Sequence, residues 1–417
     1  MSNSRTRVIS QSKAVYLTPT GWTSYGGANT KFTVEADQLQ GVDTFSYEID
    51  LAGSRQDVRE FGQLARIGTV RMSEINPTLS FGYYLSSGAN EKHLGFNESE
   101  TNASQCISAF LSEDVNKKES NIFVGVVDEG DDAVGFGDQS PSDVIGFGNC
   151  FLSSYSVNLS VGEIPRADIE MQASNVVFYS DDREGLISPS LNLDGTRAEP
   201  DSAGSPKPNI DLPDAEVCAD LDGGLKVLKP HDITLAFANN EGVTNDGSNA
   251  GGIGGQKFST SLSAVQSVSI DVPLAREVIE SIGTQLAYAK PLQFPIDVTM
   301  NMSALVTEFG EGALEFALTG TAGDRTTDIS VAMNAGGAEQ MKFTLKGAVL
   351  DSQSFSQGLD DNETVDLTFS AQIGGASTAD QGLFMTKLKA DDTVSRTTAA
   401  KNATTTTDAT QPIEHGS

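Results

Sequence analysis

Residues 294–302 read Phe-Pro-Ile-Asp-Val-Thr-Met-Asn-Met, and this stretch decides the fold. Apolar and polar side chains alternate in it with a period of two, the spacing that places successive side chains on opposite faces of a β-strand. The same alternation predicts strands over 76–86 and 291–305. The 41 glycines and the charged fraction of 20% favour strands and turns over long solvated helices. The sequence therefore predicts a mainly β protein.

Two segments of the chain resemble each other at one constant offset. The stretch that begins at Leu152 (Leu-Ser-Ser-Tyr-Ser-Val-Asn) matches the stretch that begins at Leu350 (Leu-Asp-Ser-Gln-Ser-Phe-Ser). Self-similarity of this kind indicates that one structural unit occurs twice. The identical pairs are Leu152/Leu350, Ser154/Ser352, Ser156/Ser354, Asp168/Asp366 and Ala173/Ala371.

A second block repeats in the same order along the chain. Ile49-Asp50-Leu51 corresponds to Ile270-Asp271-Val272, and both are followed by an arginine and two apolar residues three positions apart. That spacing predicts a short helix with one narrow buried stripe, set between two strands in each half. We interpret the two blocks as an internal duplication that covers 35–180 and 225–388. The repeated helix and core positions are Arg55, Val58, Phe61, Arg276, Ile279 and Ile282.

Three other segments have a composition that does not predict a core. Residues 1–34 contain four basic residues and no acid, which is typical either of an N-terminal arm that docks on an acidic neighbour or of a polar terminus. Residues 181–224 contain five prolines with Ser, Asp and Gly, and they predict a linker. Residues 389–417 are rich in Thr and Ala and predict a flexible tail.

The net charge of −30 excludes broad nucleic-acid binding, because an acidic surface repels phosphate. Solubility, or an origin in salty water, would also account for it. The cysteines Cys106, Cys150 and Cys218 are odd in number and form no CxxC pair, so we expect reduced thiols made in a cytoplasm. The sequence predicts neither a signal peptide nor a transmembrane segment.

The sequence offers no catalytic constellation. Its histidines, His93, His231 and His415, lie outside any HExxH motif, and no GxSxG motif is present. The glycine-rich stretch 251–257 lacks the spacing of a phosphate loop, and the acidic run 128–132 fits a surface turn better than a calcium site. We therefore expect no catalytic residue, no cofactor and no bound metal, and the protein is not expected to be an enzyme.

Three stretches of the second half resemble bacteriophage tail-tube proteins. Residues 265–283 resemble the family's strand-to-helix segment, 294–306 the following strand and 350–369 the C-terminal hairpin. The first half is similar mainly through the repeat. The resemblance implies two tandem tail-tube-like domains, each a β-sandwich or partial barrel with a short flanking α-helix, which assemble into a closed ring barrel.

The resemblance also implies a function and its partners. Three chains would form a ring with pseudo-sixfold symmetry, and stacked rings would form a conduit for genome passage in the virion tail. The partners would be other copies of the chain and further tail proteins, such as a tape-measure, terminator, baseplate or sheath protein. Viral DNA would pass through the lumen without tight binding. The departures from a minimal tube protein are the duplication, the linker and the Thr-rich tail.

The alternation in 294–303 predicts which residues line such a conduit. Its apolar face should pack on the domain core and on the helix expected at 276–288, which leaves the polar face for the lumen. The alternative is that the polar face meets outside solvent. The candidate lumen-facing residues are Asp297, Thr299, Asn301 and Ser303 and, by the repeat, Thr78 and Ser80.

Two other functions fit the same sequence. A baseplate hub or distal tail ring protein of the same virion would also use paired tube domains in threes. A secreted or surface β-sandwich that binds a ligand is a different class, and the unpaired cysteines and the lack of a signal peptide argue against it. Self-polymerisation of the pure protein into long tubes would favour the tube subunit, and isolated rings would favour the hub.

Overall fold

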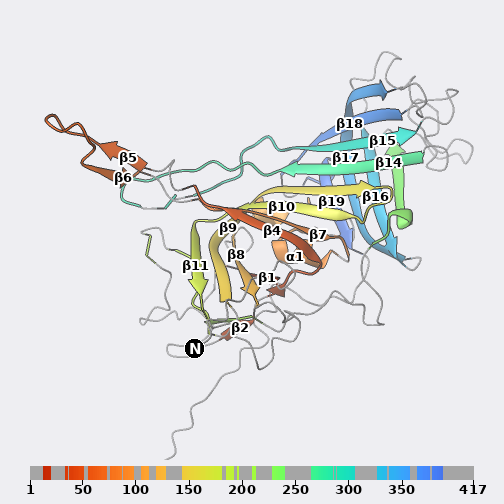
Figure 1. Cartoon of the computed structure of the whole chain (residues 1–417). Coiled ribbons are helices and arrows are strands. Elements are labelled where there is room, and N and C mark those ends of the chain that lie inside the picture. Colours follow the sequence, from red (N-terminus) through yellow and green to blue (C-terminus); the bar gives the residue numbers. More distant parts are fainter. Residues whose placement is uncertain are drawn as a thin grey trace, which may run out of the picture.

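Strands joined by antiparallel pairing dominate the computed structural model of the chain (Figure 1). Fifteen strands form one connected sheet, and the prediction of a mainly β protein is therefore confirmed. The structure describes residues 13–19, 33–35, 37–50, 55–72, 76–86, 88–97, 105–111, 119–127, 143–180, 185–191, 195–196, 209–212, 228–239, 264–284, 286–287, 289–305, 326–335, 338–356, 364–375 and 378–387.

Eight strands form the central run of this sheet, which we call the shared sheet. Their order is β4-β7-β10-β9-β14-β15-β18-β17. The first four strands come from the first half of the chain and the last four from the second half, so the β9–β14 pair joins the two halves. The strands are β4 (Val42–Glu48), β7 (Thr78–Tyr84), β10 (Arg166–Gln172), β9 (Asp143–Ser160), β14 (Ala264–Pro273), β15 (Asp297–Leu305), β18 (Thr364–Gln372) and β17 (Ala338–Ser356).

A smaller group of strands accompanies each half of the shared sheet. The first side sheet contains β1, β8, β11 and the first part of β9, and the second contains β13, β16, β19 and the first part of β17. β9 and β17 can belong to two sheets because they are 18 and 19 residues long. The added strands are β1 (Lys13–Pro19), β8 (Ser120–Val126), β11 (Asn175–Tyr179), β13 (Ile233–Asn239), β16 (Thr327–Ala335) and β19 (Gly382–Lys387).

The remaining elements are short. β3 pairs with β1, β2 pairs with β12 in parallel, and β5 pairs with β6. They are β2 (Thr33–Glu35), β3 (Asp37–Gln38), β5 (Arg55–Val58), β6 (Gly68–Arg71), β12 (Asn209–Asp211), α1 (Ala89–Leu94) and the 3-10 helices η2 (Ser108–Leu111) and η3 (Pro230–Asp232).

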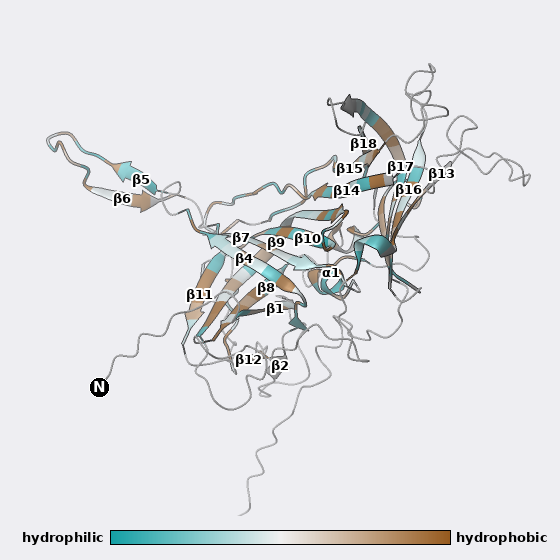
Figure 2. Ribbon diagram, turned by 45° about the vertical axis from the view of Figure 1, so that its right-hand side comes forward, coloured by the Kyte–Doolittle hydropathy of each residue, from teal (hydrophilic) through white to brown (hydrophobic). Residues whose placement is uncertain are grey.

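One hydrophobic cluster contains residues from the shared sheet and from both side sheets. Phe81 and Met300 enter it from the shared sheet, and Ile122 and Phe343 enter it from the two side sheets. Figure 2 shows the underlying alternation as bands of apolar and polar residues along the strands. Because side chains alternate between faces, one face of the shared sheet is apolar and covered while the other is polar.

The two halves use equivalent strands, in the same chain order and with the same partners. The register agrees as well, since Leu152 lies opposite Met171 just as Leu350 lies opposite Phe369. The pairing therefore places the matched residues of the first repeated block on equivalent rungs. The equivalent strands are β1 and β13, β4 and β14, β7 and β15, β8 and β16, β9 and β17, β10 and β18, and β11 and β19.

The helices predicted at the second repeated block are wrong, because both segments are hairpins. In the first arm, residues 55–72, Arg55 lies opposite Arg71 and Val58 opposite Gly68. The second arm comprises the described residues of 276–292. There Arg276 lies opposite Leu292 and Ile279 opposite Ala289, at the same spacings.

Glycine conformation and exposure explain the error. Gly62 and Gly283 occupy equivalent places near the two hairpin turns, with φ of 102° and 96°. The predicted stripe residues Phe61 and Ile282 are fully exposed, so a short helix would have no core to pack against. The apolar face of β15 therefore packs on the hydrophobic cluster and not on a helix at 276–288. A short helix does accompany the first half, as α1.

Two domain boundaries also differ from the prediction. Lys13–Pro19, predicted as part of the N-terminal arm, form β1, whose Leu17 is buried in the core. Within the predicted linker 181–224, Leu186 and Ile210 pack in a second buried cluster against the first side sheet. The apolar residues of the first segment, Ala14 to Leu17, are consecutive and do not alternate, and the apolar residues of the second segment are widely spaced, so neither segment shows a strand period. The predicted tail 389–417 lies outside the described residues.

Candidate assembly surfaces

The pair β9–β14, which we call the seam, joins the two halves of the shared sheet. It extends from Ser160 opposite Ser267 to Ser154 opposite Pro273. The two strands come from segments that are far apart in the sequence. The seam therefore shows how one half of the sheet accepts the edge strand of the other.

The shared sheet ends in two open edges that are equivalent to the strands of the seam. Among the described residues, β4 pairs only with β7, although its equivalent β14 pairs with both β15 and β9. Residues 349–356 of β17 pair only with β18, although the equivalent part of β9 pairs with both β10 and β14. Long open edges are templates for pairing with another chain.

The polar face of the shared sheet crosses the seam without interruption. One row of paired residues runs from Arg166 through Asn158, Ser269 and Asn301 to Thr368. Directly paired residues lie on the same face of a sheet. This row is therefore one continuous polar line across five strands from both halves.

The register brings the six predicted lumen-facing residues onto this one face. Ser80 lies opposite Glu170, which continues to Ser154 on β9. In the second half, Thr299 lies between Asp271 and Ser370. The exposed members of the six are Thr78, Ser80, Asp297 and Asn301, and the half-buried ones are Thr299 and Ser303.

Hydrogen bonds between side chains hold this face together. Thr368 Oγ1 donates to Asn301 Oδ1 at 3.0 Å, and Gln372 Nε2 donates to Asp297 Oδ1 at 3.1 Å. A hollow of about 320 Å³ lies on the face beside the seam, where Asn158, Ser269 and Asp366 contribute to its lining. The lining carries no basic side chain, so it does not favour an anion.

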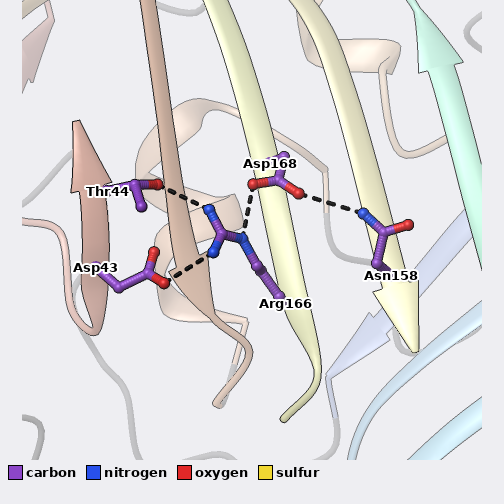
Figure 3. A network of polar contacts seen from close by, with 5 residues as sticks. All are labelled: Asp43, Thr44, Asn158, Arg166 and Asp168. Carbon is purple, nitrogen blue, oxygen red and sulfur yellow. Dashed lines mark hydrogen bonds and ion pairs between the residues drawn. The ribbon is translucent and has the colours of Figure 1, made fainter. Parts of the chain in front are cut away.

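Arg166 is the one basic residue in the part of the shared sheet formed by β4, β7, β10, β9, β14, β15, β18 and residues 349–356 of β17, and carboxylates neutralise it (Figure 3). Its Nε donates to Asp168 at 2.8 Å, and its Nη1 donates to Asp43 at 2.8 Å. Nη2 donates to Thr44 Oγ1 at 2.8 Å. Partial burial alone would lower the pKa of Arg166, but the hydrogen bond and charge of Asp168 and the charge of Asp43 raise it.

The rest of the charge on this face is acidic. Burial between strands raises the pKa of Asp271. A face with this balance repels phosphate at short range. The acids placed here by pairing are Glu48, Asp168, Glu170, Asp271, Asp297 and Asp366.

Sequence reasoning missed a buried polar cluster beneath the first half. Glu91 of α1 is buried and accepts hydrogen bonds from Tyr83 Oη at 2.8 Å and from Tyr155 Oη at 3.2 Å. Burial, and then the charge of Glu91, raises the pKa of both tyrosines well above its usual value. No sequence signal marks this cluster, because a glutamate in a short helix usually faces solvent.

The described residues contain no group of three His, Cys, Asp or Glu side chains placed to hold a metal ion. Cys106 and Cys150 are buried, free thiols. Burial raises the pKa of Cys106 to about 12, which makes a reactive thiolate at neutral pH unfavourable. The acidic run 128–132, the glycine-rich stretch 251–257 and Cys218 lie outside the described residues.

Comparison with known proteins gives no family for this chain. No family model matches it, and no curated protein matches it. No helix in the described part of the chain has the length and apolar character needed to cross a membrane.

Proposed function

We propose that this chain is a structural subunit of a viral tail tube, with a duplicated tube domain. The observation that carries the proposal is the seam. It joins two equivalent halves edge to edge, and it leaves open two edges that are equivalent to those it uses. Repeating the same contact between chains therefore requires no new kind of interface.

The open edges are different surfaces, so copies of the chain would pair head to tail. β4 of one copy would pair with residues 349–356 of the next, as β14 pairs with β9 inside the chain. A head-to-tail contact closes into a ring when its rotation divides a full turn. With eight strands from each chain, three chains would close a barrel of about 24 strands, wide enough to leave an open channel.

The faces of the shared sheet determine what such a channel would present. The side sheets cover the apolar face, so they would lie outside the ring and the polar face would line the lumen. Asp297, Asn301 and Ser80 would then face the passing genome. An acidic wall suits passage, since it does not bind phosphate and its repulsion reaches only about 8 Å at physiological salt.

The first arm follows β4 and the second follows β14, and these two strands run in the same direction because the strands between them alternate in an antiparallel order. Both arms therefore leave the shared sheet at the same end. Their turns carry the fully exposed apolar residues Phe61, Leu64 and Ile282. Exposed apolar side chains of this kind mark contact sites. In the proposed assembly these turns would contact the next ring of the stack, and other tail proteins would bind the final rings.

Negative-stain electron microscopy of the purified protein tests the proposal. Tubes with three chains and six similar lobes per ring are the expected result. Isolated rings that never elongate would favour the baseplate hub or distal tail protein. Rings of six chains would contradict the duplication argument, and a chain that stays monomeric at high concentration would refute the proposed function.

A further inference from the structure

The second arm is anchored at its base on the first half of the chain. Arg276 Nε donates to the backbone carbonyl of Leu152 on β9 at 3.1 Å, and Nη1 donates to the carbonyl of Lys290 at 2.9 Å. The guanidinium carbon lies 5.0 Å from the centre of the Phe151 ring. Arg276 therefore connects the two strands of its own arm to the neighbouring half of the sheet.

Neighbouring groups complete this anchor. Lys290 is only 7% exposed, and its Nζ donates to Asn76 Oδ1 at 3.1 Å and to Ser174 Oγ at 3.2 Å. The backbone N–H of Leu274 donates to the carbonyl of Ser153 at 2.9 Å. Burial lowers the pKa of Arg276 to about 10, with the charge of Glu119 acting in the opposite direction, so Arg276 remains charged at neutral pH.

The first arm has the same register but no anchor. Its described side chains are exposed, and Figure 1 shows the β5–β6 hairpin projecting away from the body of the protein. Arg59 and Arg66 both contact Asp57, at 3.6 and 3.0 Å. Arg55, the equivalent of Arg276, pairs with Arg71 through its backbone, but its side chain has no hydrogen bond or ion pair among the residues that the structure describes.

We infer that Arg55 anchors the first arm on a second copy of this chain, at the backbone carbonyl of Leu350. The inference rests on the proposed ring. β14 leads into the second arm and pairs with β9, where Arg276 reaches Leu152. β4 leads into the first arm, although Arg55 follows Glu48 by seven residues where Arg276 follows the equivalent Asp271 by five. The return strands agree in spacing, since Arg71 and Leu292, which lie opposite the two arginines, each come seven residues before Thr78 and Thr299. Pairing β4 with β17 of the next copy therefore places Arg55 near Leu350.

The local geometry at Leu350 fits this role. The ladder between β9 and β10 shifts register beside Leu152, and the ladder between β17 and β18 shifts register beside Leu350. Such irregularities redirect backbone groups out of the regular ladder. The two sites differ at the preceding residue, because Val349 replaces Phe151. The anchor between copies therefore lacks the ring contact and is weaker than the anchor within the chain.

Substitution of Arg55→Ala tests the inference, with Arg59→Ala as the matched control on the same arm. Assembly is followed by sedimentation velocity over a range of protein concentrations, and the monomer is followed by thermal unfolding. Arg55→Ala should raise the concentration needed for half-assembly about tenfold or more, the effect expected when a hydrogen bond from a charged group is lost. It should leave the unfolding temperature of the monomer unchanged, and Arg59→Ala should assemble like the wild type.

The outcomes separate this inference from the proposed function. If the wild type forms rings and Arg55→Ala assembles equally well, the anchor is wrong and the ring stands. A lower unfolding temperature of the Arg55→Ala monomer would mean that Arg55 acts within its own chain, which also refutes the inference. A wild type that never assembles would refute both.

Discussion

The two arms have the same hairpin register and nearly opposite surroundings. The second arm is held at Arg276 and Lys290 by the first half of the chain, whereas the first arm extends into solvent. Their sequences specify the same local pairing, so the difference lies in what stands beside each arm. The neighbour of the second arm is the first half of the same chain. The first arm would gain an equivalent neighbour only from another copy of the chain.

The largest expected effect comes from locking the open edges together. In the seam, Asn158 lies opposite Ser269, and the equivalent positions on the open edges are Ser356 and Ser46. Directly opposed antiparallel residues are close enough for a disulfide. A Ser46→Cys/Ser356→Cys variant, in a Cys218→Ser background, should therefore form covalent species up to a trimer on a non-reducing gel.

The single-cysteine variants are the controls for this experiment and should give no ladder. A ladder that continues beyond the trimer would contradict closure by three chains. Crosslinking confined to dimers made by Ser46→Cys alone would indicate that two β4 edges pair with each other, which is a different assembly.

Removal of the intramolecular anchor is expected to have the next largest effect. Arg276→Ala deletes two hydrogen bonds from a largely buried charged group and should lower the free energy of unfolding of the monomer by about 3 kcal/mol. Urea denaturation measures this loss. Glu280→Ala, an exposed change on the same arm, should cost less than about 0.5 kcal/mol. Equal stability of the two variants would show that the second arm is not anchored at its base.

Alkaline pH should destabilise the first half of the chain more than the second half, and just above pH 9 the effect should be smaller than that of Arg276→Ala. Cys106 has a folded pKa of about 12 against an ordinary value of 9.0, so the unfolded chain releases its proton first as pH rises above 9. The stability that Cys106 contributes is fully present below pH 9 and should fall by about 1.4 kcal/mol per pH unit up to pH 12. Burial also raises the pKa of Cys150, so that thiol should add to the loss above pH 9. Tyr83 and Tyr155 should add to the loss above pH 10.

The second half lacks these groups, since Ala304 and Gln353 stand at the places of Tyr83 and Tyr155. Hydrogen exchange monitored by mass spectrometry should therefore show β7 and β10 opening before β15 and β18 at pH 10. Cys106→Ala should reduce the slope between pH 9 and 10. Simultaneous opening of both halves would show that the seam unfolds them as one unit.

The smallest effect is expected from substitutions on the polar face of the shared sheet, which would line the lumen of the proposed tube. Asp297→Lys with Asn301→Lys adds positive charge to the polar face, which should make assembled tubes retain duplex DNA several-fold more at low salt and equally at high salt. Glu339→Lys, in the second side sheet, is the control. Unchanged DNA retention would place the polar face outside the lumen, and virions with the double change should likewise eject their genome poorly at low salt.

Period-two alternation carried most of the correct prediction. The strands expected over 76–86 and 291–305 appear as Thr78–Tyr84 and Asp297–Leu305, with Val298 and Met300 buried. Alternation reports which face of a strand is buried, and burial depends on the strand's own residues. The repeat around Leu152 and Leu350 also appears as an equivalent register, because paired strands preserve a constant spacing.

The errors lie where the sequence carries a spacing that two structures can satisfy. Apolar residues three apart, such as Val58 and Phe61, fit a helix face or the two sides of a hairpin turn, and exposure alone distinguishes them. In the first half, pairing also aligns Glu48 rather than Asp50 with Asp271, since Glu48 lies opposite Thr78 and Asp271 opposite Thr299. The seam could not be predicted, because the alternation of a strand indicates its buried face but not the strand with which it pairs.

The length of β9 has a mechanical consequence. This single strand pairs with β8 and β11 over its first part and with β10 and β14 over its second part. Outward pressure on the proposed wall would pull neighbouring strands apart sideways and load all the hydrogen bonds of a ladder together. The load would then pass along the covalent backbone of β9 into the first side sheet, so the side sheet would share the circumferential stress on the wall.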